Sequence, residues 1–173
     1  MNRKLDFVLS AYNTAQSMNR FSDQKASMIF LFYGIFLALL GTRVGRLVEA
    51  LRGQDLSATA VAGFVLLCAF LGLMSHSLMY ALRTIAPTFV ESNASPEHRR
   101  LYWFEDVQQR GVREYIQTLQ GLSDEQVLQE MAHELYSVQT ITRAKFERIQ
   151  RATRSAAASL MVWQVLMVLT FFL

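Results

Sequence analysis

The chain has 173 residues and a mass of 19.8 kDa, the size of a single domain. Apolar residues make up 52 % of it and charged residues 18 %, whereas soluble globular domains contain about 25 % charged residues. This balance excludes a soluble globular enzyme. The net charge of +3 would indicate a nucleic-acid partner only if the basic residues gathered on one soluble face. Many of them instead border apolar segments, so we expect no nucleic-acid partner.

Three stretches of the chain contain no charged residue. They cover 26–42, 56–82 and 155–173, which are 17, 27 and 19 residues long. A helix needs about 20 mostly apolar residues to cross a bilayer, with a range of roughly 17 to 25. We therefore predict three transmembrane helices, at 26–48, 56–83 and 155–173.

The first 25 residues carry the pattern of an amphipathic helix. Apolar side chains recur on one helical face at Leu5, Val8, Leu9, Tyr12 and Ala15. Neither Gly nor Pro occurs before residue 34. We expect a cytosolic helix over 1–25 that continues directly into the first span, and then a short loop at 43–55 with its turn at Gly53.

A longer polar region, 84–154, lies between the second and third spans, and we predict that it is helical and cytosolic. It opens with a turn-rich loop between Pro87 and Pro96. A helix is expected over 97–120, closed by Gly121, with an apolar stripe of Phe104, Val107, Val112, Ile116 and Leu119. Ser123 and Gln126 then have the spacing of a capping box.

No Gly or Pro follows this cap, so we predict one continuous helix from Ser123 into the third span. An apolar seam with seven-residue spacing indicates packing against another helix. Its members are Leu128, Met131, Leu135, Val138, Thr142, Lys145, Ile149 and Ala152. Because one chain with three spans is too small to enclose a wide pore, this seam also favours a homo-oligomer. The fold class predicted is an all-α membrane protein with three transmembrane helices and a cytosolic helical bundle.

The distribution of Lys and Arg predicts the orientation. The N-terminal segment has 4, the 43–55 segment has 3, and residues 83–154 have 10. Three spans place the first and last of these on one side, and the positive-inside rule assigns that side to the cytosol.

The sequence carries no catalytic or metal motif. His133 and Glu134 lack the second His of a zinc-protease helix, and Cys68 is the single cysteine. We expect no enzyme activity, no metal and no cofactor. His76 is the one histidine in a predicted span. Such a group either marks an ion path or is a neutral imidazole bonded to a neighbouring helix, and we favour the second.

Cationic and aromatic side chains are combined near the start of the predicted 97–120 helix. Arg99 and Arg100 precede Tyr102 and Trp103, a set that can bind a phosphate and stack a base. Tyr and Trp close to a span also anchor helices at the level of the lipid headgroups. Both interpretations remain open on the sequence.

Two segments resemble the Pycsar transmembrane effector family. Asn13 precedes an Asp23–Gln–Lys25–Ala signature that leads straight into a span, and Phe104-Glu-Asp106-Val begins a second match that continues to Lys145. Ser22 and Glu105 depart from the family pattern, which has a small Ala and a Gly at these positions. The resemblance extends over nearly the whole chain.

The resemblance implies a bacterial anti-phage effector in the inner membrane. A companion cyclase would make cyclic CMP or cyclic UMP, and the bound effector would oligomerise or rearrange, disrupt the membrane and cause abortive infection. The alternative is a constitutive membrane scaffold or channel subunit without a nucleotide ligand.

Such a nucleotide needs a cation for its phosphate and an aromatic or hydrogen-bonding wall for its base. We expect the ligand site at Arg99, Arg100, Tyr102, Trp103, Arg110, Arg113 and Tyr115. Asn13, Asp23 and Lys25 are expected to hold the first helix against the last one instead, through Lys145 or Glu147.

Overall fold

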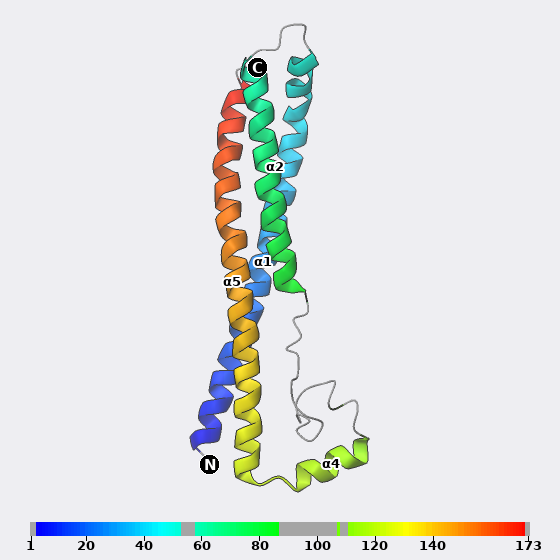
Figure 1. Cartoon of the computed structure of the whole chain (residues 1–173), viewed down its shortest axis with the longest axis vertical. Helices are drawn as coiled ribbons and strands as arrows, with labels where there is room; N and C mark the ends of the chain where they lie inside the picture. The colour runs from blue at the N-terminus through cyan, green and yellow to red at the C-terminus, as the bar shows by residue number, and fades with distance from the viewer. Residues whose placement is uncertain (1–2, 53–57, 87–106, 108–110, 172–173) are drawn as a thin grey trace. The chain divides into compact units, whose positions relative to one another are not determined.

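The computed structural model describes residues 3–52, 58–86, 107 and 111–171. Within these ranges there are four helices and no strand (Figure 1). They are α1 (Arg3–Arg52), α2 (Ala58–Ile85), α4 (Val112–Gln120) and α5 (Asp124–Phe171). Helices α1, α2 and α5 are long and apolar enough to cross a membrane, which confirms the three spans expected by length and composition.

The chain divides into two compact units. Residues 1–20 and 87–144 form one, which we call the polar unit, and residues 21–86 and 145–173 form the other, the apolar unit. Helices α1 and α5 are each unbroken, and each has one part in the polar unit and one part in the apolar unit. The absence of Gly and Pro in the first 33 residues, and in all residues after Gly121, explains why neither helix is interrupted where its composition changes.

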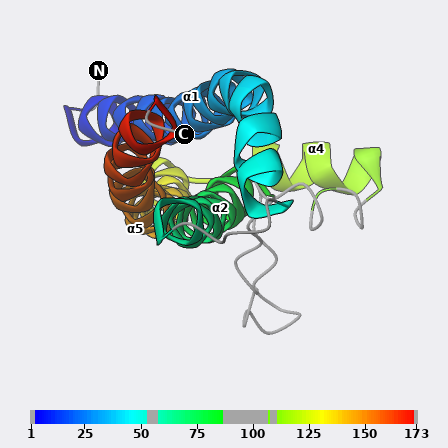
Figure 2. The same cartoon turned by 90° about the horizontal axis from the view of Figure 1, so that it is seen from above.

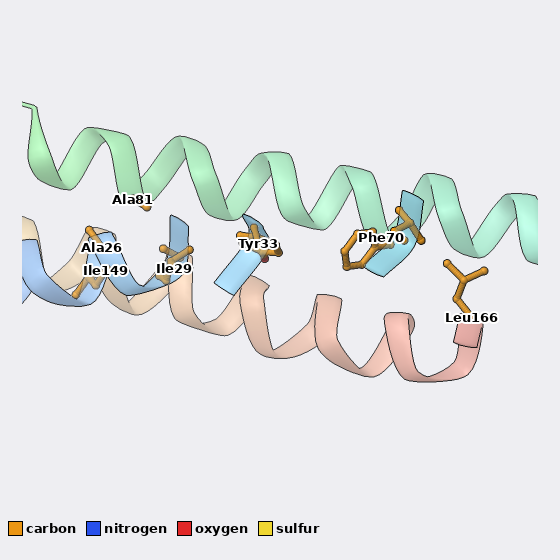
Figure 3. Close-up of a cluster of buried hydrophobic side chains, with 9 residues drawn as sticks. Ala26, Ile29, Tyr33, Phe70, Ala81, Ile149 and Leu166 are labelled. Atoms are coloured by element: carbon orange, nitrogen blue, oxygen red, sulfur yellow. The ribbon is translucent and has the colours of Figure 1, made fainter. Parts of the chain in front are cut away.

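The apolar unit consists of three helical segments that lie side by side (Figures 1 and 2). Its core includes Tyr33, Phe70 and Leu166, one from each of α1, α2 and α5 (Figure 3). Several fully buried positions in the same core are small, namely Ala26, Ala81 and Ala152. Small side chains let transmembrane helices approach closely, because lipid supplies little hydrophobic force to hold helices together.

Two of the hydrogen bonds that join α5 to its neighbours in this unit involve fully buried serines. The hydroxyls of Tyr33 and Ser159 lie 2.9 Å apart, and the Ser77 hydroxyl donates to the Ala152 carbonyl at 2.8 Å. Ser77 and Ser159 are fully buried. Close backbone approach is what brings a serine of α2 within reach of a backbone carbonyl of α5.

We expect Ala152→Leu to destabilise the apolar unit by about 1 to 3 kcal/mol, the usual cost of overpacking a core. Ala152 has no exposed surface, so a larger side chain must push a neighbouring helix away from α5. Ala158→Leu is the matched control, because Ala158 is exposed on the same helix. Thermal unfolding in detergent would measure both variants, and equal melting temperatures would contradict this packing.

The polar unit pairs the first part of α1 with the first part of α5. Val8 and Ala15 of α1 and Val138 and Thr142 of α5 are buried in it. The Thr142 hydroxyl lies 3.4 Å from the Ala15 carbonyl and donates to the Val138 carbonyl at 2.8 Å. The predicted seam therefore contacts another helix of the same chain.

Burial along α5 follows the predicted seam. Val138, Thr142, Lys145, Ile149 and Ala152 are buried, and the earlier members Leu128, Met131 and Leu135 are half-buried. The buried positions are already covered within one chain. Association between chains in this arrangement must therefore use another surface.

The structure corrects the loop expected at 43–55 over residues 43–52, because α1 continues to Arg52. The turn expected at Gly53 lies outside the described residues. Leu40 and Leu47, seven residues apart, are both buried, and Val44 between them is partly buried. This stretch keeps the helical apolar spacing of the span before it. The helix continues through Gly41 and Gly45, both of which are exposed.

The helix expected over 97–120 is described only in its last part. Helix α4 begins at Val112 with Gly111 as its N-cap, and Gly121 ends it as predicted. Residues 97–106 and 108–110 lie outside the described residues. The capping box at the start of α5 is confirmed, since the Ser123 amide donates to Gln126 Oε1 at 2.9 Å and the Gln126 amide donates to Ser123 Oγ at 3.3 Å.

Candidate functional site

An ion pair joins α1 to α5 in the apolar unit. Lys145 Nζ donates to the two carboxylate oxygens of Asp23 at 2.8 and 3.0 Å. The Lys145 side chain is 9 % exposed and that of Asp23 is 40 % exposed. Both residues lie within three positions of the boundary between the polar and apolar units on their helices. The pair thus fixes the register of α1 against α5 where each helix enters the apolar unit.

The other two residues of the signature do not join this ion pair. Lys25 is exposed, and its Nζ lies 4.5 Å from the centre of the Phe21 ring. Asn13 is exposed in the polar unit. Residues two positions apart in a helix are about 200° apart around its axis, so Asp23 and Lys25 must face nearly opposite sides of α1. The helical period alone could have separated their roles.

An open cavity of mixed polar and apolar lining, largely exposed to solvent, lies along the first part of α1 in the polar unit. Its volume is about 690 Å³, and its described lining is Asp6, Leu9, Ser10, Asn13, Thr14, Ser17 and Met18. This volume is in the range of small-ligand sites, about 300 to 1,000 Å³. Apolar surface makes up slightly more of the lining than polar surface. The hydroxyl and amide groups in it can pair with the edge of a base, and the one charged group in the described lining is the carboxylate of Asp6. Sequence reasoning named only Asn13 here, although Asp6, Ser10, Asn13 and Ser17 recur at helical spacing.

Most of the predicted arginine and aromatic site lies outside the described residues. This applies to Arg99, Arg100, Tyr102, Trp103 and Arg110, and also to the signature residues Phe104 and Asp106. Arg113 and Tyr115 belong to α4, where Arg113 is exposed and Tyr115 is half-buried. Arg113 is therefore a cation of the polar unit that a ligand in solution can reach.

His76 bonds to a neighbouring helix, which is the contact that the favoured interpretation predicts. Its Nδ1 lies 2.8 Å from the Ser155 hydroxyl of α5, and either group can donate. Its ring also packs against Tyr80 one turn later on α2, with 4.8 Å between ring centres. No cluster of His, Cys, Asp or Glu suited to a metal ion occurs in the parts of the chain that the structure describes.

Comparison with known proteins gives one result. The Pycsar effector protein domain family matches residues 7–172. No match was found among curated proteins or among solved structures. The matched segment contains the Asp23–Lys145 pair, the whole apolar unit except its last residue, and most of the polar unit. Together with three helices able to cross a membrane, this match shows that the chain belongs to the Pycsar effector family, the transmembrane effectors of Pycsar anti-phage defence.

Proposed function

We propose that this chain is a non-enzymatic effector of the bacterial inner membrane, activated by a cyclic nucleotide. Cyclic CMP or cyclic UMP from a companion cyclase binds the cytosolic polar unit, and the bound protein oligomerises or rearranges and breaches the membrane. The N-terminus and residues 84–154 face the cytosol, where Lys and Arg are concentrated, and the polar unit is the cytosolic bundle. Breach of the membrane ends growth before phage matures.

The observation that carries this proposal is the continuity of two helices. Helices α1 and α5 both run from the polar unit into the apolar unit without a break. A rigid helix passes a rotation or shift at one end to its other end. A ligand drives such a change only by binding one arrangement more tightly than another, so the ligand site belongs in the polar unit, where these helices begin.

The packing of the apolar unit supports a rearrangement on activation. The cavity among Leu40, Leu67 and Leu166 has a volume of about 10 Å³, and a water molecule needs at least roughly 10 to 15 Å³. This part of the interior therefore holds one water at most. Conduction or leakage requires the helices to separate or several chains to associate.

A cyclic nucleotide needs one kind of contact for its base and another for its phosphate, and two parts of the polar unit offer them. The cavity along α1 offers volume and hydrogen-bonding groups for a pyrimidine, among them Asn13 and Ser17. Its described lining lacks a cation, and the phosphate requires one. Arg113 of α4 is an exposed arginine of the same unit. We propose that, in the nucleotide-bound arrangement, Arg113 binds the phosphate and Asn13 reads the base.

Arg113→Ala is expected to weaken cyclic nucleotide binding by about tenfold to a hundredfold, since a hydrogen bond to a charged group contributes about 1.5 to 3 kcal/mol. Asn13→Ala should weaken it by about fivefold, the value of a neutral hydrogen bond of ~1 kcal/mol. Calorimetry of the detergent-solubilised protein against cyclic CMP and cyclic UMP measures both. Arg143→Ala is the control, because Arg143 is exposed on α5 of the same unit.

Leakage of dye from liposomes containing the protein completes the test. The parent protein should release dye only when the nucleotide is added, and Arg113→Ala should need a higher concentration. If neither nucleotide produces heat or leakage, the chain is a constitutive scaffold or channel subunit and the proposal fails. If both variants bind like the parent, the nucleotide site lies elsewhere in the chain.

A further inference from the structure

A cluster of cationic and aromatic side chains lies on α2 and α5 in the apolar unit, separate from the proposed nucleotide site. The ring of Tyr80 is its centre. The guanidinium carbons of Arg83 and Arg151 lie 5.9 and 5.7 Å from the centre of this ring, and His76 packs against it at 4.8 Å. Contacts between a guanidinium and an aromatic face within about 6 Å are attractive. The ring thus gathers two arginines from different helices.

Further contacts hold this cluster together. Arg148 Nη1 donates to the Arg83 carbonyl at 2.7 Å, and His76 bonds to Ser155 of α5 at 2.8 Å. Both contacts bridge α2 and α5. Arg83 and Arg151 are nevertheless exposed, and Tyr80 is half-buried. Their guanidinium groups are therefore positioned by neighbours while remaining accessible to a ligand from outside.

The charge around the cluster is strongly positive. Residues 76–86 and 145–155 contain five cations, Arg83, Lys145, Arg148, Arg151 and Arg154, and a single carboxylate, Glu147. Lys145 is already bound by Asp23. Even with Glu147 counted against one arginine, cations remain in excess. The complementary ligand is an anion, and arginine forks match the paired oxygens of a phosphate.

The position of the cluster along the helices indicates where that phosphate comes from. Arg83 directly follows the charge-free stretch 56–82, and Arg151 lies four residues before the charge-free stretch 155–173. The limits of two predicted spans therefore meet here. Lipid phosphates lie at this level of a bilayer, and basic sites between transmembrane helices bind anionic headgroups. Tyrosine is also enriched at this depth.

We infer that Arg83, Arg151 and Tyr80 form a binding site for the phosphate of an anionic phospholipid in the cytosolic leaflet. The lipid bridges α2 and α5 and holds them in the packed arrangement. This inference requires that the chain is embedded in a membrane, which its family and its three apolar helices support. It does not depend on the identity of the activating nucleotide.

Native mass spectrometry of the full chain in micelles tests the site. The protein is titrated with phosphatidylglycerol or with phosphatidylcholine, and the apparent dissociation constant of the first bound lipid is compared. The parent should prefer phosphatidylglycerol. Arg83→Gln and Arg151→Gln should each weaken the binding of phosphatidylglycerol by about fivefold, the contribution of one arginine near an anionic surface. The binding of phosphatidylcholine should not change. Where a Gln variant does not fold, Arg151→Lys keeps the charge without the planar fork and should show a smaller loss.

Lys25→Gln is the matched control for charge. It also removes one exposed cation that lies on an aromatic ring of the apolar unit, at 4.5 Å from Phe21. A small effect of Lys25→Gln supports a specific site. An equal loss in Lys25→Gln and Arg151→Gln would overturn it, because surface charge alone would then account for lipid binding.

Soluble competitors separate the sources of phosphate. Inorganic phosphate and glycerol phosphate should not displace the lipid, because they lack the acyl chains that hold the headgroup at this depth. Displacement by either would assign the cluster to a free phosphate. Displacement by cyclic CMP or cyclic UMP would make the cluster part of the nucleotide site. Both results would overturn the assignment to a lipid.

Discussion

Asp23→Asn is expected to destabilise the protein by about 3 to 5 kcal/mol, the cost of leaving a buried charge, here that of Lys145, without its partner. Lys145 is the more buried member, with 9 % of its side chain exposed. In the variant, the ammonium group of Lys145 faces the neutral amide of an asparagine. It therefore loses the two charge-assisted hydrogen bonds to the carboxylate. The apolar unit should therefore loosen where α1 and α5 enter it.

Removing the other member of the pair is expected to lower the free energy of unfolding much less. Lys145→Met leaves the Asp23 carboxylate, which is 40 % exposed and can be hydrated. Methionine also fills most of the space of the lysine stem among the buried residues of α5. We expect a loss of about 1 kcal/mol, close to the value of an exposed ion pair. The difference between the two variants is the quantity that the structure predicts.

Titration with sodium dodecyl sulfate, followed by circular dichroism, measures the free energy of unfolding of each variant in mixed micelles. The double variant Asp23→Asn with Lys145→Met should recover most of the loss, since no charge is then buried without a partner. Lys25→Met is the control, because Lys25 is exposed two residues later on the same helix. Equal losses from Asp23→Asn and Lys145→Met would contradict the asymmetric burial of the pair.

Phe70→Ala is expected to be the second most damaging change, with a loss near the lower end of ~3 to 5 kcal/mol. Phe70 is fully buried in the core of the apolar unit, where α2 faces α1 and α5 (Figure 3). Part of the usual cost in soluble proteins comes from transferring the side chain out of water. Lipid is as apolar as the core, so this part is small here, and the cavity left behind accounts for most of the loss.

The matched control for Phe70→Ala is Phe64→Ala. Phe64 lies on the same helix and is 49 % exposed, so removing it opens no cavity. The same titration should show a loss for Phe70→Ala that exceeds that of Phe64→Ala by at least about 2 kcal/mol. Similar losses from the two variants would show that α2 presents a different face to the other helices.

Features that depend on neighbours along one chain could be predicted from the order of the residues. Charge-free stretches of sufficient length predicted the three spans, and the capping box at Ser123 predicted where α5 begins. The continuity of α1 and α5 followed from the absence of helix-breaking residues. All of these are properties of a single helix, and the spacing of residue types contains them.

Which helix faces meet could be learned only from the fold. Sequence patterns marked both Asp23 and Lys25, but only packing shows that Asp23 contacts Lys145 while Lys25 lies over Phe21. The seam on α5 predicted a partner helix, and the fold identifies α1 of the same chain as that partner. The loop expected after residue 42 is helical because Leu47 is buried. The cluster around Tyr80 combines residues about 70 positions apart, and their meeting depends on the register between α2 and α5, which no local pattern encodes.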